Sequence, residues 1–192
     1  MEKEKKVEEN KRQEIKKSKV TVEKLNEDET KALKIIKKHN TEFEDNELIN
    51  DVLSKHFFMR ILDKRARQEI TKEMSLCSIE AGVEVFKQGK SGSYFYIVKD
   101  GILQLHIDDK FIKEVSRGES IGELALIHST PRSGTVIAKT NCLVWTLERK
   151  NFRKVVDVIN KINYEENKNF INSVRMLTAI DPELKSILSG NL

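Results

Sequence analysis

The most informative stretch of the chain is GESIGELALIHSTPRSGT, which spans residues 118–135. Within it, Gly122 precedes a short apolar turn, and Arg132 follows at the start of a β-rich run. A glycine lets the backbone approach a ligand closely, and the N–H groups of residues 123–125 can face an anion as those of a helix N-terminus do. Arg132 adds a permanently charged fork that can meet two phosphate oxygens at once. The pattern therefore predicts a phosphate site.

Glu123 stands beside this predicted anion site and needs a different role. A carboxylate repels phosphate, but it accepts hydrogen bonds from sugar hydroxyls, as acidic residues do on ribose in dinucleotide folds. The ligand that these residues imply carries one phosphate group and a ribose. The alternative is structural: the turn is then a helix cap followed by core residues, and the arginine is a surface charge.

Short β-rich runs separated by Gly or Asp turns lie on both sides of this stretch. Runs this short and this regularly punctuated are typical of a jelly-roll or a small barrel, in which closure of the sheet limits exposed edges. These runs are Leu76–Ile79, Val83–Phe86, Tyr94–Val98, Ile102–Ile107, Phe111–Val115, Thr135–Ala138 and Val144–Leu147.

The flanking segments follow helical patterns instead. Residues 2–40 are rich in Lys and Glu and contain neither Gly nor Pro, which predicts a helical or disordered extension, with a coiled coil as the alternative. Helical spacing returns from Lys150, Asn163 to Asn169 suggest a polar hinge, and Pro182 indicates a new helix start. The expected division is a charged extension over residues 1–47, a central domain over 48–177, and the start of a following domain over 178–192.

Composition limits the function classes. The 192 residues are 38% hydrophobic and 34% charged, with a formal net charge of only +4, which argues against a dedicated nucleic-acid binder. Cys77 and Cys142 have neither zinc nor disulfide-framework spacing, which fits a reducing compartment. We see no signal peptide and no apolar run of membrane-spanning length. The expectation is a cytoplasmic protein with no transmembrane segment and no nucleic-acid partner.

The segments Ile-Gly-Glu-Leu-Ala-Leu (121–126) and Pro-Arg-Ser-Gly-Thr (131–135) resemble the phosphate-binding cassette of the cyclic nucleotide-binding domain in its protein-kinase regulatory form. That cassette reads Phe-Gly-Glu-Leu-Ala-Leu, a few loop residues, then Pro-Arg-Ala-Ala-Thr. Residues 87–98 followed by Gly101, and residues 144–149, are also similar to the family, most of all to regulatory domains of cyclic GMP-dependent kinases. The resemblance covers roughly residues 53–177.

This resemblance implies a mainly β fold, an eight-stranded jelly-roll β-barrel with N-terminal helices and two C-terminal helices. It assigns the ribose hydroxyl to Glu123 and the cyclic phosphate to Arg132. Two positions depart from the family pattern, Ile121 for Phe and Gly134 for Ala, and the glycine could loosen the backbone path. The expected nucleotide-binding residues are Ile121, Gly122, Glu123, Leu124, Ala125, Arg132, Ser133, Gly134 and Lys113.

The resemblance also favours cyclic GMP over cyclic AMP. The position after the arginine, here Ser133, is often Thr or Ser in cyclic GMP sites, where the hydroxyl contacts the guanine amino group, and Lys113 occupies the place of a basic strand residue that such sites can use. No catalytic motif is present, so the expected partner is a serine/threonine kinase catalytic domain, in the same chain or a separate subunit, and no cofactor is implied.

Two alternatives stay open, a cyclic AMP-binding regulatory subunit of cyclic AMP-dependent kinase and a degenerate barrel used as a docking domain. The first should carry a basic inhibitor segment, of which residues 16–20 are a faint imitation, and the second should lack Glu123 or Arg132. Nucleotide binding is expected to move the C-terminal helices, because the cassette turn should pack on their apolar residues. The candidate residues are Phe152, Val156, Phe170 and Val174.

Overall fold

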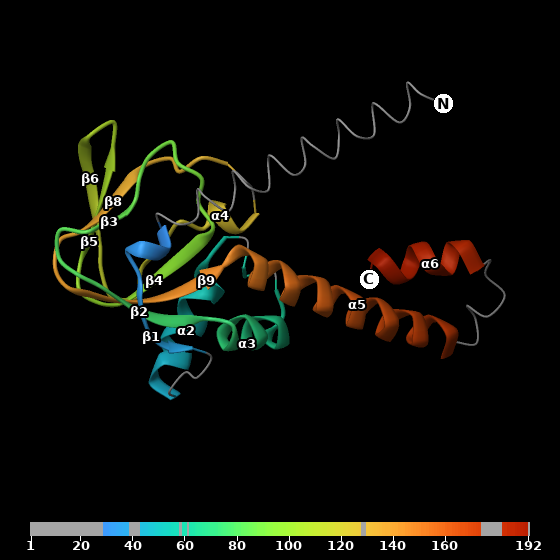
Figure 1. The fold of residues 1–192 in the computed structure, drawn as a ribbon. Helices are drawn as coiled ribbons and strands as arrows, with labels where there is room; N and C mark the ends of the chain where they lie inside the picture. Colours follow the sequence, from blue (N-terminus) through green and yellow to red (C-terminus); the bar gives the residue numbers. More distant parts are fainter. Residues whose placement is uncertain are drawn as a thin grey trace, which may run out of the picture.

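The computed structural model describes residues 29–38, 43–57, 59–60, 62–127, 130–173 and 182–191. These residues form two antiparallel sheets and several helices (Figure 1). One sheet has the strand order β1-β2-β9-β4-β7 and the other β3-β8-β5-β6. The strands are β1 (Lys34–Lys38), β2 (Ser75–Ile79), β3 (Glu84–Phe86), β4 (Tyr94–Asp100), β5 (Leu103–Ile107), β6 (Lys110–Val115), β7 (Ser120–Ile121), β8 (Thr135–Ala138) and β9 (Cys142–Glu148).

Alternation along the strands creates two hydrophobic cores, because successive side chains of a strand point to opposite faces. On β4, Phe95 and Ile97 belong to the core that the helices cover, whereas Tyr96 and Val98 belong to the core between the two sheets. Trp145 of β9 lies fully buried on the helix side. The two packed antiparallel sheets confirm the mainly β expectation.

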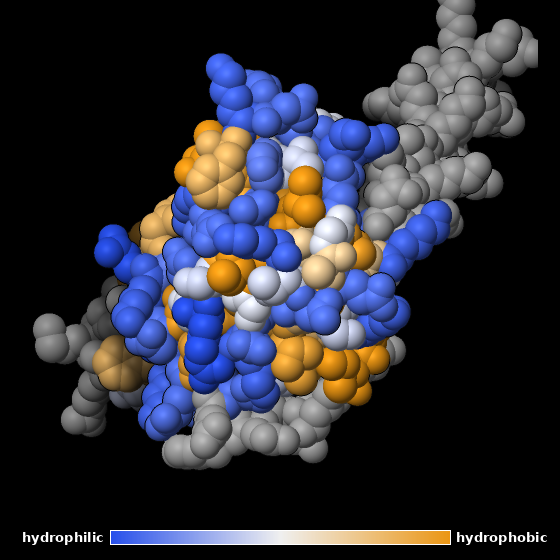
Figure 2. Space-filling view, turned by 90° about the vertical axis from the view of Figure 1, so that its left-hand side faces the viewer, coloured by the Kyte–Doolittle hydropathy of each residue, from blue (hydrophilic) through white to orange (hydrophobic). Residues whose placement is uncertain are grey.

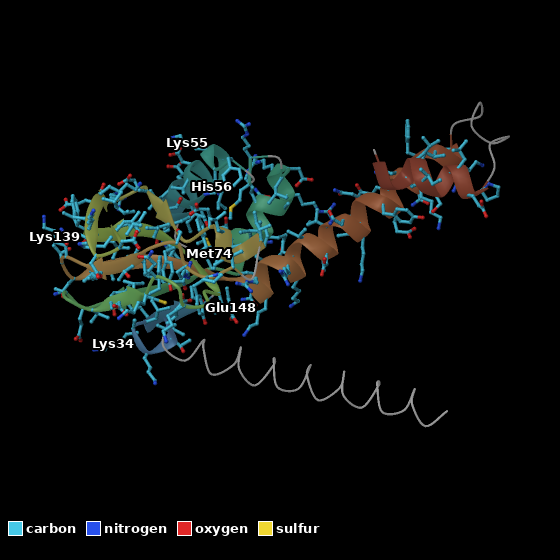
Figure 3. The ribbon with its side chains drawn as sticks, turned by 90° about the horizontal axis from the view of Figure 1, so that it is seen from above. Lys34, Lys55, His56, Met74, Lys139 and Glu148 are labelled. Carbon is cyan, nitrogen blue, oxygen red and sulfur yellow. The ribbon has the colours of Figure 1, made fainter. Side chains whose placement is uncertain are left out.

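The helices are α2 (Phe43–Lys55), α3 (Lys64–Lys72), the short α4 (Leu124–Ile127), α5 (Arg149–Ser173) and α6 (Pro182–Asn191). Helices α2, α3, α4 and the first part of α5 share a core with one side of the five-stranded sheet, whereas α6 packs on α5. Figure 3 shows Met74, between α3 and β2, inside the β domain, and Glu148 where β9 meets α5. Asp63 accepts a hydrogen bond from the N–H of Ala66 at 2.6 Å and so caps α3, as expected for an Asp at a helix start.

The expected hinge from Asn163 to Asn169 is wrong for this structure, since α5 continues through both residues as one helix. The polar stretch lies on a helix that leaves the sheets, with α6 beside it (Figure 1). Tyr164 Oη lies 3.1 Å from Ser186 Oγ, and Asn167 donates to the Ser189 carbonyl at 3.2 Å. Tyr164 and Asn167 thus link α5 to α6, and α6 starts at the predicted Pro182.

The N-terminal extension also differs from the expectation. Residues 34–38 were expected to be helical or disordered, yet they form β1, which pairs antiparallel with β2 through Lys34 opposite Ser78 and Ile35 opposite Cys77. Helix α2 then begins at Phe43, ahead of the predicted domain boundary at residue 48. The coiled-coil alternative falls mainly on residues 1–28, which lie outside the described residues.

Within the described ranges, no helix is both long and apolar enough to cross a membrane.

Candidate functional site

The structure brings all nine predicted site residues to one pocket of about 190 Å³. The pocket lies between β6, β7, the turn into α4 and the start of β8, so residues from either end of the cassette meet there. Its lining combines charged and apolar side chains. Besides the predicted residues, Phe86, Leu105, Ser120, Thr130 and Pro131 complete the wall.

Figure 2 shows the end of the molecule that carries β3, β5, β6 and β8. Hydrophobic side chains there form separate patches with hydrophilic side chains between them.

Arg132 is the most constrained of the predicted residues. Its side chain is only 4% exposed, and its Cζ lies 4.0 Å from the ring centroid of Phe86. Nη2 donates to the Tyr94 carbonyl at 2.8 Å, and Nη1 donates to the Gly122 carbonyl at 3.2 Å. Nε donates to Glu29 Oε1 at 2.8 Å. A guanidinium held on three sides in this way has one orientation relative to the pocket.

Two glycines make room for this guanidinium. A Cβ on Gly92 would lie 2.1 Å from Arg132 Nε, and a Cβ on Gly122 would lie 2.6 Å from Arg132 Nη1. Gly122 also has a φ of +84°, which side-chain-bearing residues rarely adopt. In this structure the backbone at Gly122 comes close to Arg132, and its predicted approach to a ligand stays a prediction.

Glu123 is half-buried in the turn before α4, at the pocket. Among the described residues, none forms a hydrogen bond or ion pair with its carboxylate. Burial lowers the pKa of the neighbouring His56, and the Glu123 charge acts in the opposite direction. Of the three N–H groups expected to face an anion, that of Ala125 donates to the Gly122 carbonyl at 3.2 Å, so it is already engaged.

Lys113 and Ser133 lie on the rim of the pocket. Lys113 stands on β6 opposite Leu105 of β5, and its half-exposed Nζ lies 3.7 Å from Glu119 Oε1. Ser133 is exposed. Both residues therefore line the pocket and remain exposed to solvent.

Gly134, one of the two departures from the family pattern, is closely packed in this structure. A Cβ at this position would lie 2.7 Å from the His106 carbonyl oxygen and 2.8 Å from Leu105 Cδ1. The loop is therefore packed directly on β5, where even alanine meets a backbone atom.

The start of α5 is joined to the cassette by two arginines that sequence reasoning did not single out as site residues. Arg149 donates through Nε to the Ala125 carbonyl and through Nη2 to the Gly92 carbonyl. Arg153 donates to the Ile127 carbonyl at 3.2 Å. These bonds satisfy carbonyls at the end of α4, which a helix end leaves without partners of its own.

The apolar contacts expected between cassette and C-terminal helix are present only near the start of α5. Phe152 shares the helix-side core with Leu126 of α4, and Val156 packs against that core. Phe170 is 61% exposed, so it does not cover the cassette. Val174 lies outside the described residues.

Residues 76–158 match the family model described as cyclic nucleotide-binding domain. The chain therefore carries a cyclic nucleotide-binding domain. The matched region runs from β2 into α5 and contains the whole pocket. The fold around the pocket is thus the one that the sequence resemblance implied.

Curated relatives of the domain are kinase proteins. The cGMP-dependent protein kinase of Plasmodium berghei is 32% identical over 147 residues, which cover 77% of this chain and 17% of that protein. The corresponding kinase of Toxoplasma gondii is 31% identical over 146 residues. The cAMP-dependent protein kinase regulatory subunit of Eremothecium gossypii is 32% identical over 108 residues, or 56% of this chain and 24% of that protein. The chain thus spans a quarter or less of these relatives.

Among solved structures, the regulatory domain of Toxoplasma gondii PKA with cAMP aligns with a TM-score of 0.55 and 26% identity. The alignment covers 79% of this chain and 60% of that one. A cyclic nucleotide-binding-like protein from Brucella abortus aligns with a TM-score of 0.53 and 25% identity, over 58% of this chain and 98% of that one. The chain resembles the regulatory nucleotide-binding domain of kinases and not a catalytic domain.

Proposed function

We propose that this domain binds cyclic GMP in the pocket around Arg132 and regulates a serine/threonine protein kinase. The observation that carries the proposal is a guanidinium fixed by four neighbours at the wall of a pocket that Glu123 also lines. A fixed arginine suits a phosphate, because two of its N–H groups can meet two oxygens with little loss of side-chain entropy.

The remaining site residues have complementary proposed roles. The Glu123 carboxylate, which lacks a partner within the described residues, accepts hydrogen bonds from the ribose hydroxyl. The backbone at Gly122 comes close to the phosphate, because this residue has no side chain. Apolar groups of Ile121, Leu124 and Ala125 form the wall beside them.

The choice of cyclic GMP rests on the rim. Ser133 is exposed at the pocket and can offer its hydroxyl to the guanine amino group, which adenine lacks. Lys113 lines the same pocket and can donate to a purine oxygen. The relatives from Plasmodium berghei and Toxoplasma gondii, both named as cGMP-dependent kinases, support the same choice.

Calorimetric titration with cyclic GMP and cyclic AMP tests the ligand directly. We expect both nucleotides to bind and cyclic GMP to bind more tightly. Tighter binding of cyclic AMP would favour the second candidate, a regulatory subunit of cyclic AMP-dependent kinase, which the Eremothecium gossypii relative supports. Binding of neither nucleotide would leave the third candidate, a docking domain, although this chain keeps both Glu123 and Arg132.

Control of a kinase requires an element whose position changes when the nucleotide binds, and we propose that this element is α5. A ligand that shifts the turn before α4 pulls on the carbonyls to which Arg149 and Arg153 donate, and both arginines stand on α5. The shift can be no larger than the difference in ligand affinity between the two arrangements. The kinase catalytic domain would lie in the same chain or in a separate subunit.

The domain limits belong to the same proposal. The nucleotide-binding domain, predicted over residues 48–177, has to begin earlier, because β1 belongs to its five-stranded sheet and α2 begins at Phe43. We propose residues 178–192, which include α6, as the start of a following domain. The two thiols, Cys77 and Cys142, are free and buried, which supports a reducing, cytoplasmic location.

A further inference from the structure

A buried carboxylate from the N-terminal segment lies against Arg132, the residue that we propose binds the phosphate. Glu29 is 3% exposed, and its Oε1 lies 2.8 Å from Arg132 Nε and 2.7 Å from Arg132 Nη2. Its Oε2 accepts a hydrogen bond from the N–H of Ser93 at 3.1 Å. Glu29 lies outside residues 76–158, the part of the chain that matches the domain family. This chain therefore supplies the counter-ion of its pocket arginine from a separate segment.

Glu29 and the nucleotide pocket lie on different edges of the guanidinium. Glu29 does not line that pocket; it lines a neighbouring cavity with Lys87 and Lys90. Glu29 lies against Nε and Nη2 of Arg132, whereas Nη1 donates to the carbonyl of Gly122, which does line the pocket. Nη1 carries a second N–H, so a ligand can bind there without displacing the carboxylate.

We propose that Glu29 is a positioning residue that holds Arg132 in the orientation that binds the cyclic phosphate. This inference rests on the proposed function, because it assigns the same arginine to phosphate. A charge-assisted bond on the far edge fixes the side chain before the ligand arrives, so binding loses less conformational entropy. The carboxylate also compensates a charge that would otherwise be buried without an ionic partner.

The segment that carries Glu29 is itself bound to the sheet. Leu33 packs on the core between the sheets, and β1 extends the five-stranded sheet next to β2. Lys34 forms an exposed ion pair with Glu80, and Figure 3 shows Lys34 at the outer edge of the β domain. Binding free energies are coupled reciprocally. If docking of residues 29–38 favours nucleotide binding, nucleotide must favour docking of these residues to the same extent.

The test is the affinity of the full chain for cyclic GMP after Glu29→Gln, which keeps the size of the side chain and removes its charge. We expect binding to weaken about tenfold, which corresponds to ~1.4 kcal/mol. The matched control is Glu80→Gln, which removes the exposed ion pair of the same segment and should leave affinity unchanged. The proposal is supported if Glu29→Gln weakens binding of cyclic GMP and Glu80→Gln leaves the affinity unchanged.

Glu29→Gln could also weaken binding by disturbing the fold. Combining it with Arg132→Ala separates such a structural effect from an effect on the position of Arg132. If Glu29 acts through Arg132, Glu29→Gln should have no further effect on affinity in the Arg132→Ala background. An equal effect in both backgrounds would overturn the proposal, as would unchanged or tighter binding in the single variant. Failure of the unaltered chain to bind any cyclic nucleotide would instead refute the proposed function.

Hydrogen exchange gives a second measurement that needs no comparison of affinities between variants. Cyclic GMP should slow exchange of the β1 amides in the unaltered chain, because the coupling is reciprocal. If nucleotide protects the pocket but leaves hydrogen exchange in β1 unchanged, the proposed coupling is overturned.

Discussion

Replacement of Arg132 by lysine keeps the positive charge at the pocket but removes the planar guanidinium group. In the structure the guanidinium reaches Glu29, the Tyr94 carbonyl and the Gly122 carbonyl at once, and it stacks on Phe86. A lysine has a single nitrogen and no planar group to stack, so it cannot replace these contacts and also bind phosphate as the guanidinium does. Both affinity and stability should therefore fall.

The loss of affinity can be estimated from the bonds removed. A hydrogen bond to a charged group contributes about 1.5–3 kcal/mol, so loss of bidentate phosphate binding together with alignment should amount to about 2–4 kcal/mol. That corresponds to a cyclic GMP affinity about 30-fold to 700-fold weaker. Carbonyls left without a donor should lower the free energy of unfolding by about 1–3 kcal/mol.

Calorimetric titration measures the affinity, and urea unfolding shows whether the variant is folded at the titration temperature. Arg65→Lys is the matched control, because Arg65 lies on α3 and its side chain is 55% exposed. Within the part of the chain that the structure describes, that side chain makes only a surface ion pair with Glu166 at 3.3 Å. The control should bind as the unaltered chain does. A folded Arg132→Lys variant with affinity within about twofold of the unaltered chain would refute the assigned phosphate site.

Four further outcomes are expected. Ser133→Ala should weaken cyclic GMP about twofold to tenfold in titration and spare cyclic AMP, since one neutral hydrogen bond is lost; equal weakening would mean that the hydroxyl only supports the loop. Cyclic GMP should slow hydrogen exchange along α5, and Arg149→Ala should reduce that effect while protection at the pocket persists; protection confined to the sheets would place the signal elsewhere. Gly134→Ala should lower the free energy of unfolding by about 1–3 kcal/mol in urea, because its Cβ would lie 2.7 Å from the His106 carbonyl, and an unchanged value would show that the loop shifts freely. Burial lowers the pKa of His56 below 6.5 in the folded state, so as pH falls the unfolded state takes up the proton first and the free energy of unfolding decreases below pH 6.5. His56→Asn should make the decline in unfolding free energy between about pH 7.5 and about pH 5.5 shallower, and an identical decline would exclude His56 as its source.

The pocket could be predicted from sequence because its main residues are close together in the chain. Gly122, Glu123 and Arg132 belong to one turn and the strand start that follows it, so spacing alone places them near one another. The strands were legible for a similar reason, since alternation of buried and exposed side chains is a local property of a sheet with two covered faces.

Local sequence patterns predicted the wrong secondary structure in two segments where tertiary contacts outweigh local preference. Asn163 to Asn169 look like a break, yet asparagine is only mildly unfavourable in a helix, and contacts with α6 accompany the continuous helix. Residues 34–38 look like part of a charged helix, but the edge of β2 offers unpaired backbone groups, and pairing with them satisfies the backbone of β1.

The sequence by itself predicted the mainly β domain, the place of the pocket and nine of the residues that line it. Only the tertiary structure decided that Glu29 is the partner of Arg132, because 103 positions separate the two residues and no pattern marks one glutamate among many in a charged segment. The pair forms because a guanidinium that is 4% exposed needs an opposite charge, and folding brings one buried carboxylate within 2.8 Å of it.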